Sequence, residues 1–377
     1  MSYTSTKGFW GAGCHINVAL AGRDTITQFR IKTAGETGAA SSDAMIVIEG
    51  LTKRFGPFTA VDSISFSVAR GEVLGFLGPN GAGKSTTMKM VTGFLSPTEG
   101  SARVCGHDVV SDTLAAQRTI GYLPEGAPAY GDMSPRGFLR FIARVRHLSG
   151  AVADKAIEEA VAATELQGVL DQPIDTLSKG FRRRVGFAQA ILHNPPVLIM
   201  DEPTDGLDPN QKYEVRKLIK RMSADKAIII STHILEEVDA ICSRALIIDR
   251  GRVVADGTPA ELISRSRYHN AVTLTVEGKL TVASAEMLKA LPGVVSMEVL
   301  PRGTETVLTL FTARGTATDT VAGDLGLLDA VATVAREQSW IVRGLYGEPG
   351  RLDEVFRALT RSDVDDFVQS QSEKSAA

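Results

Sequence analysis

The sequence predicts an α/β fold built around a phosphate-binding loop (P-loop), with a helical subdomain and a smaller α+β domain after it. Short apolar runs alternate with helical patterns from residue 46 to about 265, which is typical of α/β proteins. A glycine-rich segment directly follows one of these runs. From about residue 270 short strands and helices follow in the order βαββαβ, the ferredoxin-like plan.

The first 44 residues differ from the rest of the chain. They contain little periodic apolar pattern and are rich in Gly, Ser, Thr and Ala, so we predict a flexible N-terminal extension over 1–44. From Met45 the pattern changes abruptly, and 45–48 and 60–68 read as strands. Met45 is therefore the expected start of the folded domain. Either the extension belongs to the natural protein or translation also begins at Met45, and the sequence leaves both open.

The α/β domain is expected over 45–265. Four compact apolar runs within it have the character of strands buried on both faces, at 73–77, 197–200, 227–230 and 245–248. The part from about 111 to 190 is mostly helical in pattern, which predicts a helical subdomain inserted between the strands.

The C-terminal α+β accessory domain is expected over 266–360, followed by a disordered tail over 361–377. No constellation in 270–360 resembles a metal or catalytic site. The domain is either a regulatory or dimerising module or an appendage that only adds stability. The expected strands and helices alternate along the chain at 271–276, 283–291, 294–300, 305–311, 319–335, 340–345 and 352–359.

Composition narrows the class of protein. The chain of 377 residues has 41 basic and 44 acidic residues and a net charge of −3, which argues against a nucleic-acid partner. Its longest stretch without charged residues, 185–200, is interrupted by Pro195 and is shorter than the about 20 apolar residues of a spanning helix. Three scattered cysteines and the lack of a signal-peptide pattern favour a reducing compartment, so we expect a cytoplasmic location.

The glycine-rich segment matches the pattern G-x-x-x-x-G-K-[ST] between an apolar strand and a helical run. Its glycines let consecutive backbone N–H groups face a phosphate at a helix N-terminus. Lys84 would reach the terminal phosphates, and the Ser85 hydroxyl would ligate Mg²⁺. The candidate nucleotide-binding residues here are Gly78, Pro79, Asn80, Gly81, Ala82, Gly83, Lys84, Ser85 and Thr86.

Two carboxylates follow the strand at 197–200. Ligands of open α/β sheets bind at the carboxyl ends of the strands, where Asp201 and Glu202 are expected to lie. Asp201 would hold Mg²⁺, and Glu202 would act as general base on the attacking water. The alternative is a solvated turn, which the phosphate-binding loop makes the weaker interpretation.

Residues 46–265 resemble the ATP-binding cassette (ABC) family, specifically the separate ATPase subunit of an export-type (ABC-2) transporter. The resemblance implies a P-loop NTPase fold, with ATP and Mg²⁺ as cofactors. It also implies that Phe55 stacks on adenine, although a phenylalanine here is also compatible with a core position. Further matches are the signature at 177–181 with Ser178 and Gly180, the D-loop residue Asp208, and the switch histidine His233, the expected γ-phosphate sensor.

Two motifs depart from the family pattern. Glu125 replaces the usual glutamine of the Q-loop and is a further candidate ligand of Mg²⁺. Lys179 and Phe181 replace Gly and Gln in the signature, and Lys179 either adds charge towards a phosphate or simply faces solvent. The next three residues, Arg182, Arg183 and Arg184, are interpreted as a solvated or partner-facing helix surface and not as a nucleic-acid site.

One phosphate-binding loop and one signature imply a homodimer with two composite ATP sites, because in this family each signature completes the partner's site. The implied activity is ATP hydrolysis that powers a separate transmembrane permease, which would hold the chain at the cytoplasmic face of the membrane. Residues 208–211 and 352–356 resemble the gliding-motility and copper/nitrous-oxide exporter ATPases. The alternative is a soluble ABC ATPase that acts on the ribosome or DNA, which a single cassette without heptads disfavours.

Overall fold

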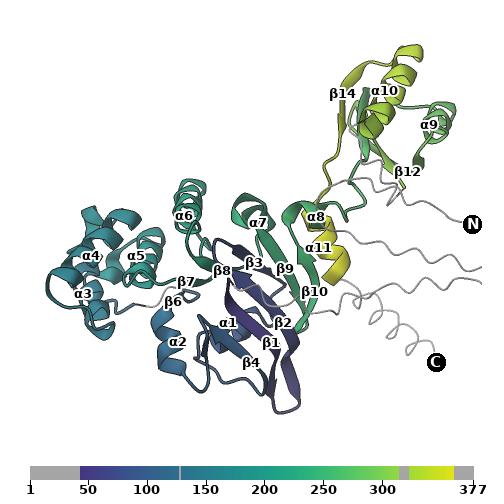
Figure 1. The fold of residues 1–377 in the computed structure, drawn as a ribbon. Helices are drawn as coiled ribbons and strands as arrows, with labels where there is room; N and C mark the ends of the chain where they lie inside the picture. The colour runs from purple at the N-terminus through teal and green to yellow at the C-terminus, as the bar shows by residue number, and fades with distance from the viewer. Residues whose placement is uncertain (1–42, 127–128, 314–321, 361–377) are drawn as a thin grey trace, which may run out of the picture. The chain divides into compact units, whose positions relative to one another are not determined.

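The structure, a computed structural model, describes residues 43–126, 129–313 and 322–360 (Figure 1). The predicted tail and nearly all of the predicted N-terminal extension therefore lie outside the described residues. Among the helices that are described, none combines the length and the hydropathy that crossing a membrane requires.

The first sheet is antiparallel, with strand order β2-β1-β4-β5. In β1 and β2, buried apolar residues are interspersed with more exposed ones, as expected of a sheet with one covered face. The strands of this sheet are β1 (Ala44–Phe55), β2 (Phe58–Ala69), β4 (Glu99–Val104) and β5 (His107–Asp108). The strands predicted at 45–48 and 60–68 are confirmed, since they fall within β1 and β2.

The second sheet has strand order β10-β9-β3-β8-β7-β6 and is parallel except for the pairing of β10 with β9. Every residue of β3, β7 and β8 is buried, which confirms the prediction from their continuous apolar runs. The strands are β3 (Val73–Leu77), β6 (Ile120–Leu123), β7 (Val197–Asp201), β8 (Ala227–Thr232), β9 (Arg244–Asp249) and β10 (Arg252–Gly257). The strand β6 lies inside the range 111–190 that was predicted to be mostly helical. It is a strand because its short apolar run pairs with β7.

Three helices gather into one bundle, which is the predicted helical subdomain: α3 (Pro135–Val145), α4 (Gly150–Thr164) and α5 (Lys179–Ile191) (Figure 1). Phe138, Leu139, Val161 and Val185 belong to its core. Two short 3₁₀ turns, at Gln167–Val169 and Ile174–Thr176, join the last two helices.

Two of the remaining helices of the α/β domain have side-chain caps at their N-termini. Asp208 caps the helix that follows β7, and a capping box at Thr258 starts the last of them. The helices are α1 (Lys84–Val91), α2 (Thr113–Thr119), α6 (Pro209–Met222), α7 (Leu235–Ile241) and α8 (Pro259–Ile263).

The third sheet is antiparallel, with strand order β12-β13-β11-β14. Leu274, Leu308 and Leu310 of the sheet form one core with Leu288 and Val331 of two helices. The predicted order βαββαβ is confirmed by the elements themselves: β11 (Val272–Glu277), α9 (Val282–Lys289), β12 (Val294–Arg302), β13 (Glu305–Thr312), α10 (Ala322–Glu337) and β14 (Val342–Gly347).

The final helix, α11 (Leu352–Thr360), lies within the range predicted for the accessory domain, but it packs against the α/β domain. Leu352 belongs to the same buried cluster as Leu262 of α8 and Ile247 of β9, and Phe356 packs against that cluster. The helix α11 thus contributes to the core of the α/β domain, while the boundaries at 265 and 360 stay predictions.

Candidate nucleotide-binding site

The parallel strands β3, β8 and β7 are neighbours and end at the same edge of the sheet. Leu77, the last residue of β3, pairs with Thr232, and Asp201 pairs with Ser231. The segments that follow these strands therefore emerge side by side, as the general rule for ligand sites in open α/β sheets requires. This edge gathers the phosphate-binding loop, the two acids and His233.

At two positions of the phosphate-binding loop, neighbouring backbone leaves no room for a side chain. Gly83 has φ 105°, and a Cβ there would lie 2.5 Å from the carbonyl oxygen of Ala60. A Cβ at Gly78 would lie 2.4 Å from the carbonyl oxygen of Ile248. Because both obstacles are backbone atoms, a side chain at either position would displace the loop.

The ammonium group of Lys84 lies within this loop. The side chain is buried, and its Nζ donates hydrogen bonds to the carbonyl oxygens of Gly78 (2.7 Å) and Pro79 (3.2 Å). Burial lowers the pKa of Lys84, while the carboxylates of Glu202, Asp201 and Glu125 act to raise it. The ammonium group of Lys84 therefore lies close enough to all three acids to interact with them electrostatically.

The other residues of the loop lie where the sequence predicts. Asn80 and Gly81 are more exposed than the buried Ala82, and Ser85 and Thr86 are half-buried in the first turn of α1. A helix N-terminus with half-buried hydroxyl groups is suited to phosphate oxygens and to a cation bound with them.

Asp201 and Glu202 have different surroundings although they are adjacent. Asp201 is 2% exposed and accepts a hydrogen bond from the hydroxyl of Ser231. Glu202 adopts the left-handed conformation (φ 49°), which turns its side chain away from the direction of the strand. Its carboxylate lies 2.9 Å from Nδ1 of His233. Burial raises the pKa of Glu202, and the hydrogen bond from His233 partly opposes this shift.

The residues present fit Mg²⁺ bound together with phosphate. Within the described residues, no group of three or more His, Cys, Asp or Glu side chains is arranged to hold a metal by itself. Mg²⁺ is commonly held by one or two carboxylates with substrate phosphates. Asp201, the exposed Glu125 and the Ser85 hydroxyl supply oxygen ligands of this kind near the ammonium of Lys84.

The signature and the D-loop lie against each other. Ser178 caps α5 by accepting a hydrogen bond from the Phe181 N–H (3.3 Å), and Asp208 caps α6 by accepting from the Gln211 N–H (3.0 Å). A Cβ at Gly180 would lie 2.5 Å from Nε2 of Gln211. The glycine of the signature therefore leaves room for the amide at the end of the flexible Gln211 side chain.

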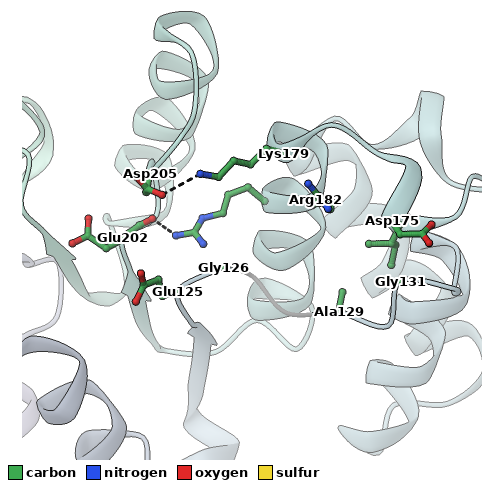
Figure 2. A pocket seen from close by; sticks show the side chains of 11 residues that line it. Glu125, Gly126, Ala129, Gly131, Asp175, Lys179, Arg182, Glu202 and Asp205 are labelled. Atoms are coloured by element: carbon green, nitrogen blue, oxygen red, sulfur yellow. Dashed lines mark hydrogen bonds and ion pairs between the residues drawn. The ribbon is translucent and has the colours of Figure 1, made fainter.

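The side chain of Lys179 is 60% exposed, which agrees with the interpretation that it faces solvent. It also forms an ion pair with Asp205. Its Nζ lies 3.2 Å from the Asp205 carboxylate, and a Cβ at Gly206 would overlap this ammonium. Figure 2 shows this pair beside a cavity of about 380 Å³, whose lining includes Glu125 and Glu202.

Phe55 lies at the end of β1 and is 49% exposed, which excludes the alternative of a core position. The ammonium of Lys53 lies 5.3 Å from the centre of its ring. The ring is thus accessible for stacking.

The interpretation of the three consecutive arginines as one solvated surface is wrong for Arg183. Arg182 is exposed, and Arg184 pairs with the Glu165 carboxylate at 2.6 Å. Arg183 is only 5% exposed, and it donates hydrogen bonds to the backbone carbonyl oxygens of Asp201, Glu202 and Pro203. Successive residues of a helix point about 100° apart, so one of three arginines faces the core.

Sequence reasoning also missed Glu237. Its carboxyl group is 1% exposed and accepts hydrogen bonds from the hydroxyls of Thr204 and Thr232. Thr204 follows Glu202 by two positions and Thr232 precedes His233. A buried acid among hydroxyls is recognisable only from the fold, because no local pattern marks it.

Comparison with known proteins agrees with this geometry. The family model for ABC transporters matches residues 61–205. Nod factor export ATP-binding protein I of Ralstonia nicotianae is 37% identical over 224 residues, which cover 59% of this chain and 70% of the relative. The linearmycin resistance ATP-binding protein of Bacillus subtilis is 35% identical over 235 residues, covering 62% and 76% of the two chains.

A solved structure shares the fold. It is a dimeric ATP-binding cassette in a post-hydrolysis state with ADP and Pi, with a TM-score of 0.53 and 23% identity, covering 57% of this chain and 99% of that one. With more than two thirds of a relative's length matched at 37% identity, the chain belongs to the ATP-binding proteins of the ABC transporter family.

Proposed function

We propose that this chain binds ATP with Mg²⁺, hydrolyses it to ADP and phosphate, and so powers an ABC-2-type exporter whose membrane subunit is a separate chain. The contact between Glu202 and His233, 2.9 Å long and at the same sheet edge as Lys84, carries the proposal. The names of the two relatives, one an export protein and one a resistance protein, support export.

Binding of the nucleotide uses the loop and the aromatic ring. The backbone N–H groups of 79–84 and the N-terminus of α1 bind the phosphates, and Phe55 stacks on the base. The ammonium of Lys84 exchanges its carbonyl partners for phosphate oxygens, which makes a stronger, charge-assisted contact. Ser85, Asp201 and Glu125 would hold Mg²⁺, which would neutralise charge on the phosphates.

Hydrolysis uses Glu202 as the general base for the attacking water. A raised pKa makes this carboxylate a better proton acceptor than an ordinary glutamate, provided that it remains ionised at the working pH. His233 donates to the carboxylate from Nδ1, fixes its orientation and senses the γ-phosphate with the rest of the imidazole.

The composite site requires a second copy of the chain. Ser178 and the N–H groups at the start of α5 form an anion-binding helix terminus, and Asp208 lies beside it at the start of α6. In our proposal this surface meets the nucleotide of the partner, and the homodimer holds two ATP molecules. The dimer described for the structural relative is consistent with this arrangement.

The permease would hold the homodimer at the cytoplasmic face of the membrane, and no nucleic acid takes part. The test is to purify the chain from its own cells with bound membrane proteins and to measure ATP hydrolysis in vesicles with candidate cargo. We expect a membrane protein to co-purify and cargo to stimulate hydrolysis, while Lys84→Ala abolishes it. Recovery of ribosomes or DNA instead of a membrane protein would favour the alternative of a soluble ATPase.

A further inference from the structure

We infer that Arg183 is a positioning residue that couples the helical subdomain and the Glu125 loop to the carboxylate of Glu202. The inference rests on the proposed function, because it concerns the control of the same site. The residue belongs to α5, the helix that begins at the signature, and its guanidinium group contacts the backbone of Asp201 and Glu202.

The guanidinium group of Arg183 donates to four backbone carbonyl oxygens. Three belong to consecutive residues where β7 ends: Asp201 (2.7 Å), Glu202 and Pro203 (3.0 Å). The fourth belongs to Pro124 (3.3 Å), which precedes Glu125. One side chain thus joins α5 to both chain segments that carry the candidate acids.

The geometry of the contacts determines what this junction does. A guanidinium group is planar, and its N–H groups point in fixed directions, so the three consecutive carbonyls are held in one arrangement. Glu202 lies at the middle of them in a left-handed conformation that an L residue rarely adopts without support. The direction of the Glu202 side chain therefore depends on where α5 holds Arg183.

Charge supports the same assignment. Arg183 is 5% exposed, and burial lowers its pKa, while Asp205, Asp201, Glu202 and Glu125 favour the charged form. A buried cation persists only where its donors find acceptors and opposite charges surround it, and here each of the three guanidinium nitrogens donates at least one hydrogen bond. A movement of α5 displaces this cation and the Glu202 backbone together, so that the state of the helical subdomain sets the readiness of the base.

The test compares full-length Arg183→Met and Arg183→Lys with the wild type, and uses the exposed Arg140 of the same subdomain as a control, Arg140→Met. Affinity for ATP should stay unchanged in Arg183→Met, because the hydrogen bonds given for Arg183 go to Pro124 and to residues 201–203 and not to the phosphate-binding loop. The kcat should fall about 10- to 100-fold, the loss expected when a catalytic group is displaced by about 1 Å. Arg183→Lys should lie in between, because it keeps the charge but has fewer N–H directions.

A double-variant cycle separates coupling through Glu202 from a general loss of structure. If Arg183 acts by positioning Glu202, Arg183→Met should cause no further loss of kcat in a Glu202→Gln background. The inference would be overturned if Arg183→Met lowered kcat equally in the wild-type and Glu202→Gln backgrounds, or if the single variant Arg183→Met left kcat unchanged. The proposed function would still stand in either case, as long as the wild type hydrolyses ATP. If Arg183→Met does not fold, Arg183→Lys is put through the same cycle and decides by the same criterion. A wild type without any ATP hydrolysis would contradict the proposed function itself.

Discussion

Glu237 connects the two segments that carry Glu202 and His233, and its removal should destabilise the α/β domain strongly. Its carboxyl group is 1% exposed and accepts from the hydroxyl groups of Thr204 and Thr232, the latter at 3.1 Å. The ammonium of Lys212 lies 4.0 Å away. The perturbation is Glu237→Ala.

The magnitude follows from these contacts. Each hydroxyl that loses its buried partner costs about 1–3 kcal/mol, and the long contact with Lys212 adds little because that side chain is partly exposed. The two losses together amount to about 2–6 kcal/mol. At about 2–4 °C per kcal/mol for a domain of this size, Tm should fall by roughly 4–24 °C.

Thermal unfolding followed by circular dichroism measures this difference. The exposed neighbour Glu236 provides the matched control, and Glu236→Ala should leave Tm almost unchanged. Glu237→Gln keeps one acceptor oxygen, so its Tm should lie between those of the wild type and Glu237→Ala. A Tm of Glu237→Ala equal to that of Glu236→Ala would refute the reasoning, since the two hydrogen bonds would then contribute nothing.

Three further outcomes are expected. Gly83→Ala should abolish binding of a fluorescent ATP analogue, because its Cβ would meet the Ala60 carbonyl, whereas Gly106→Ala, with nothing within 4 Å, should bind it normally. Phe55→Ala should raise the Kd for ATP about 2- to 13-fold, which corresponds to about 0.5–1.5 kcal/mol of stacking; an unchanged Kd would remove Phe55 from the site. Burial raises the pKa of Glu202, and only its ionised form accepts a proton. When the pH is lowered, basal kcat should therefore begin to decline at a pH above the usual glutamate pKa. A pH profile with an acidic limb at the ordinary glutamate pKa would contradict this shift.

The same shift has a consequence for stability. A carboxyl group whose pKa is higher in the folded than in the unfolded state stabilises the fold below its unfolded pKa. That contribution disappears as the pH rises through the folded value. At neutral pH, Glu202→Gln should therefore have a higher Tm than the wild type, and in acid the two Tm values should converge. Melting curves of both proteins at the two pH values measure this difference.

The central part of the parallel sheet was predictable because its strands β3, β7 and β8 are short and almost entirely apolar. The runs that become β3, β7 and β8 are buried on both faces, which leaves few alternatives to a central parallel sheet. The strand β6 was harder to recognise, since Ile120–Leu123 is short and follows a helix, and only its pairing with β7 makes it a strand.

The candidate site was predictable where chemistry depends on local spacing. The loop from Gly78 to Ser85 has fixed residue types between a strand and a helix, and the structure places it at the expected edge. Arg183 and Glu237 were not predictable in this way. Their partners, such as Pro203 and Thr204, are 20 and 33 positions away in the sequence, so their roles arise from tertiary packing.

The central claim is that Glu202 is the base that hydrolyses ATP held by the phosphate-binding loop. The most direct measurement is phosphate release from a single turnover of MgATP, recorded for the wild type and Glu202→Gln together with ATP binding. We predict that Glu202→Gln retains bound ATP and releases phosphate about 10²- to 10⁴-fold more slowly. Equal rates of phosphate release by the two proteins would contradict the assignment.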